Sequence, residues 1–309
     1  MKVYMLSRID HNKLSWIDIH KPSSHEIAKI AEEFSLSNEI SEELMRPSFH
    51  PKAENTLDTI FLVFHLPLYD TRLLERHSRE IDIIISKKFL LTIHYDPIEP
   101  LADLFSKAEL DLNFRKILFG NSADKILYEL WQKTYDQLMA ELDHIQKKVD
   151  RIEDRIFSDE RKEFIEEVSI LRRDVLDFHR SIRPHGLLIE EFAPLSRAVF
   201  GPEFSSNIKS LSQKYRRLLS LADNNKDALE VLYDTYNALQ NRRSTEVMKV
   251  FTMLALMTFP LTLIAAIFSI ETKSRPIVGS PNDFWIILAI MVGVVIGMLF
   301  YFKSKKWIN

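Results

Sequence analysis

Polar and small side chains recur along one uncharged stretch near the end of the chain, where chemistry with ions could take place. The stretch runs from Val250 to Ile270 and contains no charged residue. Steps of three or four residues place such side chains, together with two large apolar ones, on one face of a helix. These residues are Thr252, Ala255, Phe259, Thr262 and Ala266, and the same steps extend before the stretch to Thr245 and Met248. The pattern is typical of an ion pathway or of close helix packing, and both interpretations stay open.

Residues for catalysis are scarce by comparison. The chain of 309 residues has no cysteine and only 6 glycines, which excludes thiol catalysis, thiolate metal sites and disulfides. It contains neither an HExxH nor a GxSxG sequence. His65 and His94 fall inside expected strands, where a packed ring is favoured over a metal ligand. We therefore predict a protein that is not an enzyme, has no covalent cofactor and does not bind nucleic acid.

Two apolar runs, Val250 to Ile270 and Phe284 to Phe302, indicate a membrane protein. The first would rise roughly 31 Å as a helix, which matches a hydrocarbon core of about 30 Å. No signal-like segment precedes them, so we expect both termini on one side of the membrane. The flanking cations are Arg242, Arg243, Lys249, Lys303, Lys305 and Lys306. The positive-inside rule therefore predicts a multi-pass protein of the cell (inner) membrane with cytoplasmic termini.

A coiled-coil pattern precedes the first apolar run. No glycine or proline interrupts Glu203 to Phe259, so one helix from about Asn207 to Ile270 is expected. Apolar residues recur there at alternating steps of three and four. The positions are Ile208, Leu211, Tyr215, Leu218, Ala222, Leu229, Leu232, Tyr236 and Leu239, with Asn225 between Ala222 and Leu229. Leu127 to Ile156 shows the same spacing, and packing within one chain and packing between chains both stay open.

The N-terminal part predicts an α/β domain. Short β-prone runs alternate there with helical stretches. We expect strands at Met1–Met5, Ser15–Ile19, Thr59–Leu66, Ile81–Ile85 and Phe89–His94, and helices at Ser24–Phe34 and Pro100–Leu112. Ser23 or Ser24 is the expected N-cap of the first helix. Two shorter helices, Phe164–Ile182 and Leu187–Val199, are expected between the long helical segments.

Several strings in the sequence resemble one family of membrane proteins. These are Thr245-Glu-Val-Met-Lys-Val-Phe-Thr252, Phe259-Pro-Leu-Thr-Leu-Ile264, a second apolar run, Lys305-Lys-Trp307, Trp16-Ile-Asp-Ile-His-Lys-Pro22 and His50-Pro-Lys-Ala-Glu54. Together these strings resemble the CorA family of divalent-cation channels. The resemblance covers essentially the whole chain.

The resemblance implies an α+β membrane protein that assembles as a homopentamer in the lipid bilayer. An N-terminal α/β/α cytoplasmic domain would be followed by a long stalk helix that continues into the first of two transmembrane helices. The implied segments are 1–115 for the α/β domain, 116–202 for helical hairpins, 203–246 for the stalk, 247–270 and 284–302 for the transmembrane helices, 271–283 for the external loop, and 303–309 for a basic cytoplasmic tail. The implied pore-lining residues are Thr245, Met248, Phe251, Ala255, Phe259, Thr262 and Ala266. Lys303, Lys305 and Lys306 would form a basic ring.

The chain departs from this family at the loop after the first transmembrane helix. Where members carry Gly-Met-Asn, the sequence has Ser269-Ile270-Glu271. Five Glu271 carboxylates would form a strong cation-attracting ring and a possible metal site, whereas neutral acceptors suit hydrated magnesium. A second departure is Ser210, which occupies the position of an expected stalk aspartate.

The sequence therefore predicts a pentameric channel or transporter that carries Mg²⁺ or another divalent cation. Transport of zinc, cobalt or nickel, with or without proton coupling, is an alternative because the acidic loop suits a softer or partly dehydrated ion. A second alternative is a scaffold or sensor that keeps the fold and transports nothing.

Overall fold

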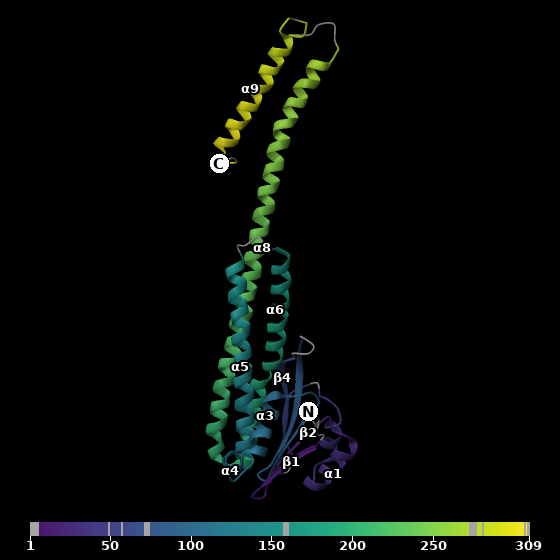
Figure 1. Cartoon of the computed structure of the whole chain (residues 1–309), viewed down its shortest axis with the longest axis vertical. Coiled ribbons are helices and arrows are strands. Elements are labelled where there is room, and N and C mark those ends of the chain that lie inside the picture. The colour runs from purple at the N-terminus through teal and green to yellow at the C-terminus, as the bar shows by residue number, and fades with distance from the viewer. Residues whose placement is uncertain are drawn as a thin grey trace. The chain divides into compact units, whose positions relative to one another are not determined.

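The computed structural model describes residues 6–48, 50–56, 58–70, 75–156, 161–271, 277–279, 281–305 and 307. Two compact units make up the chain, Met1–Leu232 and Tyr233–Asn309. The helix α8 (Ser205–Ser269) begins in the first unit and ends in the second, as its colour shows in Figure 1. The expected strand Met1–Met5 and the predicted ring residue Lys306 lie outside the described residues.

A six-stranded sheet with the order β1-β2-β6-β5-β4-β3 lies at the centre of the first unit. Its strands are β1 (Leu6–His11), β2 (Leu14–His20), β3 (Lys52–Thr56), β4 (Thr59–Asp70), β5 (Glu75–Ile85) and β6 (Phe89–His94). Strands β2 and β6 run parallel, and the other neighbours pair antiparallel. The four expected strands within the described residues are confirmed. The edge strands β1 and β3 were missed because their polar sequences lack a clear alternation.

One face of the sheet is covered by α1 (Ser24–Phe34) and α2 (Asn38–Glu43). Ile27 and Ile30 of α1 and Ile40 of α2 pack in a core with side chains from β2, β4, β5 and β6. Ser23 is the N-cap of α1: its hydroxyl accepts from the Glu26 amide at 3.3 Å, and the Glu26 carboxylate accepts from the Ser23 amide at 2.9 Å. This capping box confirms the expected start of the helix.

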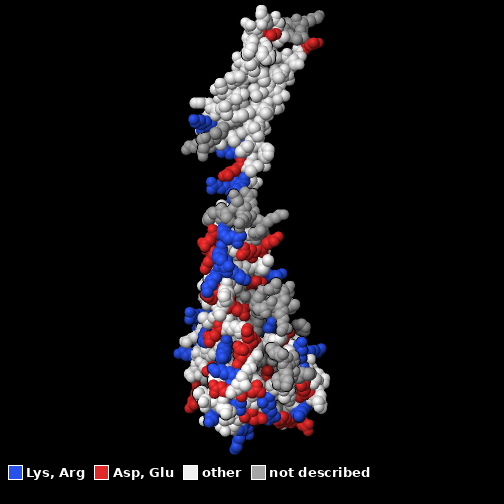
Figure 2. Space-filling view, viewed as in Figure 1, with Lys and Arg blue, Asp and Glu red and all other residues white. Residues whose placement is uncertain are grey.

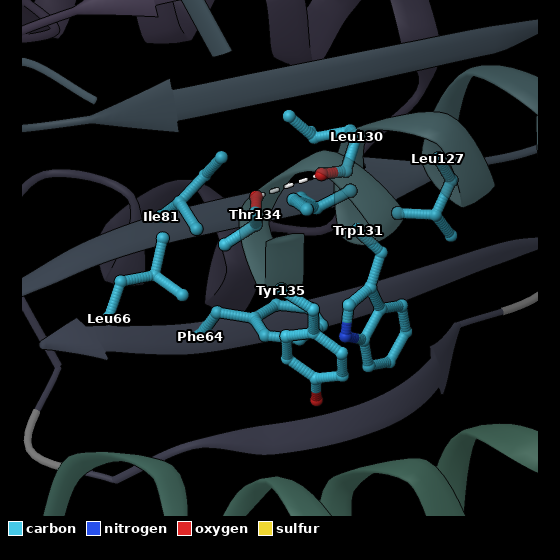
Figure 3. A pocket seen from close by; sticks show the side chains of 9 residues that line it. Phe64, Leu66, Ile81, Leu127, Leu130, Trp131, Thr134 and Tyr135 are labelled. Carbon is cyan, nitrogen blue, oxygen red and sulfur yellow. Dashed lines mark hydrogen bonds between the residues drawn. The ribbon is translucent and has the colours of Figure 1, made fainter. Parts of the chain in front are cut away.

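The opposite face is covered by α3 (Glu99–Leu110) and α5 (Asp124–Arg155), which are joined by α4 (Leu112–Phe119). The Trp16 ring of β2 packs edge-on against Phe105 of α3 at 4.9 Å. Figure 3 shows Trp131 and Tyr135 of α5 beside Phe64 of β4, in a narrow apolar pocket that also contains Leu66 and Ile81. Helices on both faces of the sheet confirm the expected α/β/α arrangement.

The seam of the coiled-coil pattern is buried within the first unit. Helices α5, α6 (Arg161–Ile182) and the first part of α8 form a bundle. The buried seam residues of α8 in this unit are Ile208, Leu211, Tyr215, Leu218, Ala222, Asn225, Leu229 and Leu232. Lys214 of α8 pairs with Asp136 of α5 at 2.6 Å, and His179 of α6 contacts Asp223 of α8 at 2.9 Å. The sequence left open whether this seam packs within one chain or between chains. For these residues, the structure shows packing within one chain.

The turn between α6 and α7 (His185–Phe200) lies close against α8. A Cβ atom at Gly186 would stand only 2.9 Å from the Tyr215 hydroxyl oxygen, so glycine permits this approach. The same hydroxyl donates to the Arg183 carbonyl at 2.9 Å. A short 3-10 turn, η1 (Pro202–Phe204), then leads from α7 into α8. The turn is thus held to α8 by both packing and a hydrogen bond.

His185 at the start of α7 is fully buried and neutral. Its Nε2–H donates to the His65 carbonyl at 3.0 Å, and its Nδ1 accepts from the Tyr135 hydroxyl at 3.2 Å. One imidazole proton satisfies both contacts. Burial lowers the pKa of His185 to about 4. The ring therefore ties α7 to β4 and α5 only in its neutral form.

The buried ring makes the first unit sensitive to acid. Because the folded pKa lies below the unfolded value of about 6.5, the unfolded chain binds the proton first, and stability falls as pH drops from about 6.5 toward about 4. At pH about 5 the expected loss from this group is about 2 kcal/mol. Urea unfolding of the full-length protein in detergent, followed by tryptophan fluorescence, measures it.

A His185→Gln variant should lose less stability on acidification than the wild type, although it is less stable at neutral pH. His25→Gln provides the matched control, because His25 of α1 is exposed and makes no comparable buried contact. Equal acid sensitivity of wild type and His185→Gln would contradict the assignment.

Candidate functional site

The second unit contains two helices that are long and apolar enough to cross a membrane, the end of α8 and α9 (Asp283–Ser304). Figure 2 shows this part as an uncharged section that has Lys and Arg at one end and acidic residues at the other. The sequence places Lys303 and Lys305 at the end of α9 and Glu271 and Asp283 at the loop between the helices. This charge distribution agrees with a segment that spans a bilayer.

Half-buried residues follow one face of each of these helices. On α8 they are Met253, Met257, Pro260, Leu261, Ile264 and Phe268. On α9 they are Ile287, Met291, Val294, Val295 and Met298, with Phe302 fully buried. Both sets recur at steps of three and four, so each helix turns one side toward the other.

The seven predicted pore residues lie on the other side of α8. All seven are exposed, including Phe259 at 72% and Met248 and Phe251 at 64%. At about 100° per residue, their mean direction is roughly opposite to that of the half-buried face. The residues are Thr245, Met248, Phe251, Ala255, Phe259, Thr262 and Ala266. One chain therefore leaves this face uncovered.

The threonine hydroxyls on this helix donate to the backbone of their own turn. Thr245 donates to the Asn241 carbonyl at 2.9 Å, and Thr262 donates to the Thr258 carbonyl at 2.8 Å. With its proton engaged, each hydroxyl oxygen presents only lone pairs to the exposed side. Pro260 lies inside the helix and has no N–H to donate. The exposed face thus offers oxygen acceptors among apolar side chains.

The predicted loop site begins where α8 ends. Ser269 is the last helical residue, and the Ile270 amide donates to the Ile267 carbonyl at 3.3 Å. Glu271 follows and is exposed. A carboxylate beside a helix C-terminus adds to the negative end of the helix dipole and therefore strengthens the attraction for cations.

The predicted basic residues lie at the opposite end of α9. Lys303 is in the last turn and Lys305 is the C-cap, and both are exposed. Trp307 folds back so that its ring stacks on Phe302 at 5.7 Å, and its amide donates to the Phe302 carbonyl at 2.9 Å. Aromatic rings and lysines at a helix end are typical of the membrane–water interface.

Within the described part of the chain, no three His, Asp or Glu side chains are arranged to hold a metal ion. Ser210, at the position of the expected stalk aspartate, accepts from the Tyr128 hydroxyl at 3.3 Å and from the Gln132 amide at 3.2 Å, both on α5. His65 and His94 are packed and hydrogen-bonded, as expected. The buried acidic pair Glu80 and Asp82 was not predicted, because its only signal in the sequence is two acids that alternate with Ile81 and Ile83.

Comparisons with known proteins agree on one family. Residues 11–305 match the family described as CorA-like Mg²⁺ transporter protein. The chain is 26% identical to the cobalt/magnesium transport protein CorA of Thermotoga maritima, over 97% of this chain and 85% of that protein. It is 21% identical to the protein of the same name from Methanocaldococcus jannaschii, over 96% of this chain and 92% of that protein.

A solved structure agrees in fold with nearly the whole chain. The complete structure of the CorA magnesium transporter from Methanocaldococcus jannaschii superposes with a TM-score of 0.82 at 21% identity. The superposition covers 97% of this chain and 93% of that one. The N-terminal α/β domain, the long helix and the two candidate transmembrane helices therefore recur together.

Proposed function

The chain belongs to the CorA family of Mg²⁺ transporters, and we propose that it carries divalent cations across a membrane. In this proposal Mg²⁺ is the favoured ion, and it passes along the central axis of a homopentamer in the cell (inner) membrane. The relatives named as Mg²⁺ and cobalt transport proteins support the ion class. The charge distribution around α8 and α9 supports cytoplasmic termini.

The observation that carries the proposal is the uncovered face of α8. Helix α9 leaves this face exposed, and it holds both large apolar side chains and the Thr262 hydroxyl. Two helices cannot screen an ion from lipid, so further copies of the chain are needed to enclose a pathway. Five copies would place the seven exposed positions around one axis, with the apolar rings of Phe251 and Phe259 as constrictions that can close by dewetting.

The donor groups on this face suit an ion that keeps its water. Mg²⁺ gives up its hydration shell reluctantly and is bound largely through water. Threonine oxygens and apolar rings, without a group of three charged ligands among the described residues, would bind such an ion weakly. Weak binding allows an ion to leave as well as to enter. The exposed face of α8 therefore suits an ion that passes through better than an ion that stays bound.

Zinc, cobalt or nickel is the second candidate cargo, and Glu271 is the observation that favours it. The carboxylate stands at the negative end of α8, where Gly-Met-Asn is absent. Fixed negative charge attracts any cation and offers a direct ligand to an ion that dehydrates more easily. In this proposal Lys303, Lys305 and Lys306 form a basic ring at the cytoplasmic end. A scaffold or sensor without transport remains the competing class, and flux decides between them.

Ion flux tests the proposal directly. Purified protein in proteoliposomes should take up Mg²⁺ from an inward gradient faster than protein-free vesicles, with uptake of zinc, cobalt and nickel compared in the same assay. Glu271→Gln should raise the half-saturating concentration by about threefold to tenfold at low ionic strength, because a ring of charge concentrates cations. The difference should shrink at high salt.

Glu271→Asp keeps the charge and should remain close to wild type. Absence of divalent flux under every gradient would contradict transport and leave the scaffold or sensor class. Equal half-saturation for wild type and Glu271→Gln at low salt would contradict the role of the carboxylate only.

Thiol labelling tests the orientation of α8. The chain has no cysteine, so single cysteines report one position each. In proteoliposomes, Thr262→Cys should react with a membrane-impermeant thiol reagent at least about tenfold faster than Ile264→Cys, because only a hydrated thiol ionises readily. Mg²⁺ flux should fall as Thr262→Cys is labelled. Faster labelling at position 264, which lies on the half-buried face, would reverse the assigned orientation.

A further inference from the structure

Two acidic side chains are buried side by side in β5, away from the membrane segments. Glu80 is 6% exposed and Asp82 is 0% exposed, and their spacing of two residues puts both on the face that α1 and α2 cover. Buried carboxyl groups are costly unless they are fully hydrogen-bonded or protonated.

Glu80 is well supplied with donors. Both of its carboxylate oxygens accept from the Ser48 amide at 2.8 Å, and Oε2 lies 3.2 Å from Nε2 of His65. The same Nε2 lies 3.0 Å from the Ser48 carbonyl, which can only accept. His65 therefore carries its proton on Nε2 and holds it between the carbonyl and the carboxylate. These contacts fit an ionised Glu80.

Asp82 has fewer hydrogen-bond donors around it than Glu80. Its Oδ2 lies 3.2 Å from the Tyr95 hydroxyl, which also lies 3.2 Å from the Leu44 carbonyl. Tyr95 has one proton, and the carbonyl cannot supply another, so both contacts are satisfied together only when Asp82 is protonated. The buried Oδ1 of Asp82 has no hydrogen-bond partner among the described residues. The geometry thus favours the neutral acid.

The surrounding charges also favour a protonated Asp82. The loop between α2 and β3, residues 44–48 and 50–51, is called the covering loop below. The groups that face the pair are Glu43 from α2, Lys52 from β3, His65 from β4, Tyr95 and Asp96 after β6, His50 from the covering loop, and Arg180 from α6. Lys52 is engaged by Glu43 at 2.6 Å and by Glu54 at 3.1 Å. Burial raises the pKa of Asp82 well above its usual range, and Glu80 raises it further. For His65, burial opposes the charged ring, but the hydrogen bonds to Glu80 and Ser48 and the charge of Glu80 together outweigh it, so the pKa is raised.

Solvent reaches the edge of this cluster. A cleft of about 510 Å³ is lined by His65, Glu80, Tyr95 and residues of the covering loop on one side and by Arg180 and Pro184 on the other. Protons can therefore reach His65 without unfolding of the sheet. The cleft also adjoins the turn between α6 and α7.

A chain of contacts links the cluster to α8. The His65 carbonyl accepts from His185 at the start of α7. The next residue, Gly186, lies against Tyr215 of α8, whose hydroxyl donates to the Arg183 carbonyl. A displacement of β4 or of the covering loop at this point therefore changes the support of α8.

We propose that His65, Glu80 and Asp82 form a proton-binding regulatory site. With protons on His65 and Asp82, the three groups carry no net charge and residues 44–48 stay closed on the sheet through Leu44 and Ser48. Loss of both protons leaves two buried negative charges, which repel each other and open this segment. The opening releases the turn at 183–186 and removes a restraint on α8. Its last step, faster ion flux, rests on the proposed transport function.

The direction of the pH response follows from the pKa changes of His65 and Asp82. Both folded pKa values are raised, so the closed form is favoured at low pH and is lost as pH rises through the folded values. The response of His185 has the opposite sign and lies at lower pH, so the two effects separate.

Hydrogen exchange of the full-length protein tests the site without any need for transport. As pH is raised above about 6.5, the ordinary pKa of histidine, exchange of residues 44–48 and 183–187, corrected for the intrinsic rate, should accelerate about tenfold. Asp82→Asn cannot ionise and should abolish most of this acceleration. Glu80→Gln, a second variant, should move the acceleration to lower pH, because the Glu80 carboxylate raises the pKa of both Asp82 and His65. Asp18→Asn is the matched control, since Asp18 accepts from Thr92 elsewhere in the sheet.

Flux in proteoliposomes, with pH varied on the side of the N-terminal domain, tests the last step. Wild-type Mg²⁺ flux should rise by about threefold over this range, and Asp82→Asn flux should not. Wild type without accelerated exchange, or Asp82→Asn with the same acceleration, would overturn the site. Accelerated exchange with pH-independent flux would overturn regulation only. Absence of flux at every pH would count against the transport function while the exchange result still judges the site.

Discussion

Helices α8 and α9 have more apolar surface than one chain can bury, and this constraint shapes the rest of the molecule. Helix α9 covers one side of α8, while Phe259 and Met248 on the other side remain exposed. Lipid can cover apolar side chains, but it offers nothing to the hydroxyl oxygen of Thr262. In the proposed assembly, other copies of the chain would meet both needs, since they would face apolar rings to one another and leave water along their shared axis.

One helix has to satisfy two environments, and its sequence changes accordingly. From Ile208 to Leu232 the apolar residues of α8 form a single seam that α5 and α6 bury, with charged residues on the opposite side. From Val250 onward the charges end and apolar residues occupy every side. Because the backbone hydrogen bonds continue from one part to the other, the support that α8 receives in the first unit bears on the whole helix.

Buried polar groups in the first unit differ in how completely they are satisfied. His185 has one proton and two partners, so its neutral form leaves nothing unpaired. Asp82 has one contact, an unpaired oxygen and an acidic neighbour, so its environment is satisfied only by a proton from solvent. A group of the first kind stabilises a single packing arrangement, whereas a group of the second kind makes the packing depend on pH.

The large elements could be predicted from the sequence, because their signals are local and repeated. Hydrophobic period and length predicted α8, α9, α5 and the central strands, and Ser23 or Ser24 with Glu26 predicted the start of α1. The three-dimensional packing was needed to identify which surfaces meet. It showed that the coiled-coil seam packs within one chain, that the seven positions from Thr245 to Ala266 face away from α9, and that Glu80, Asp82, His65 and Tyr95 converge. Periodicity describes which side of an element is apolar, but the partner of that side and the protonation of a buried acid depend on residues distant in the chain.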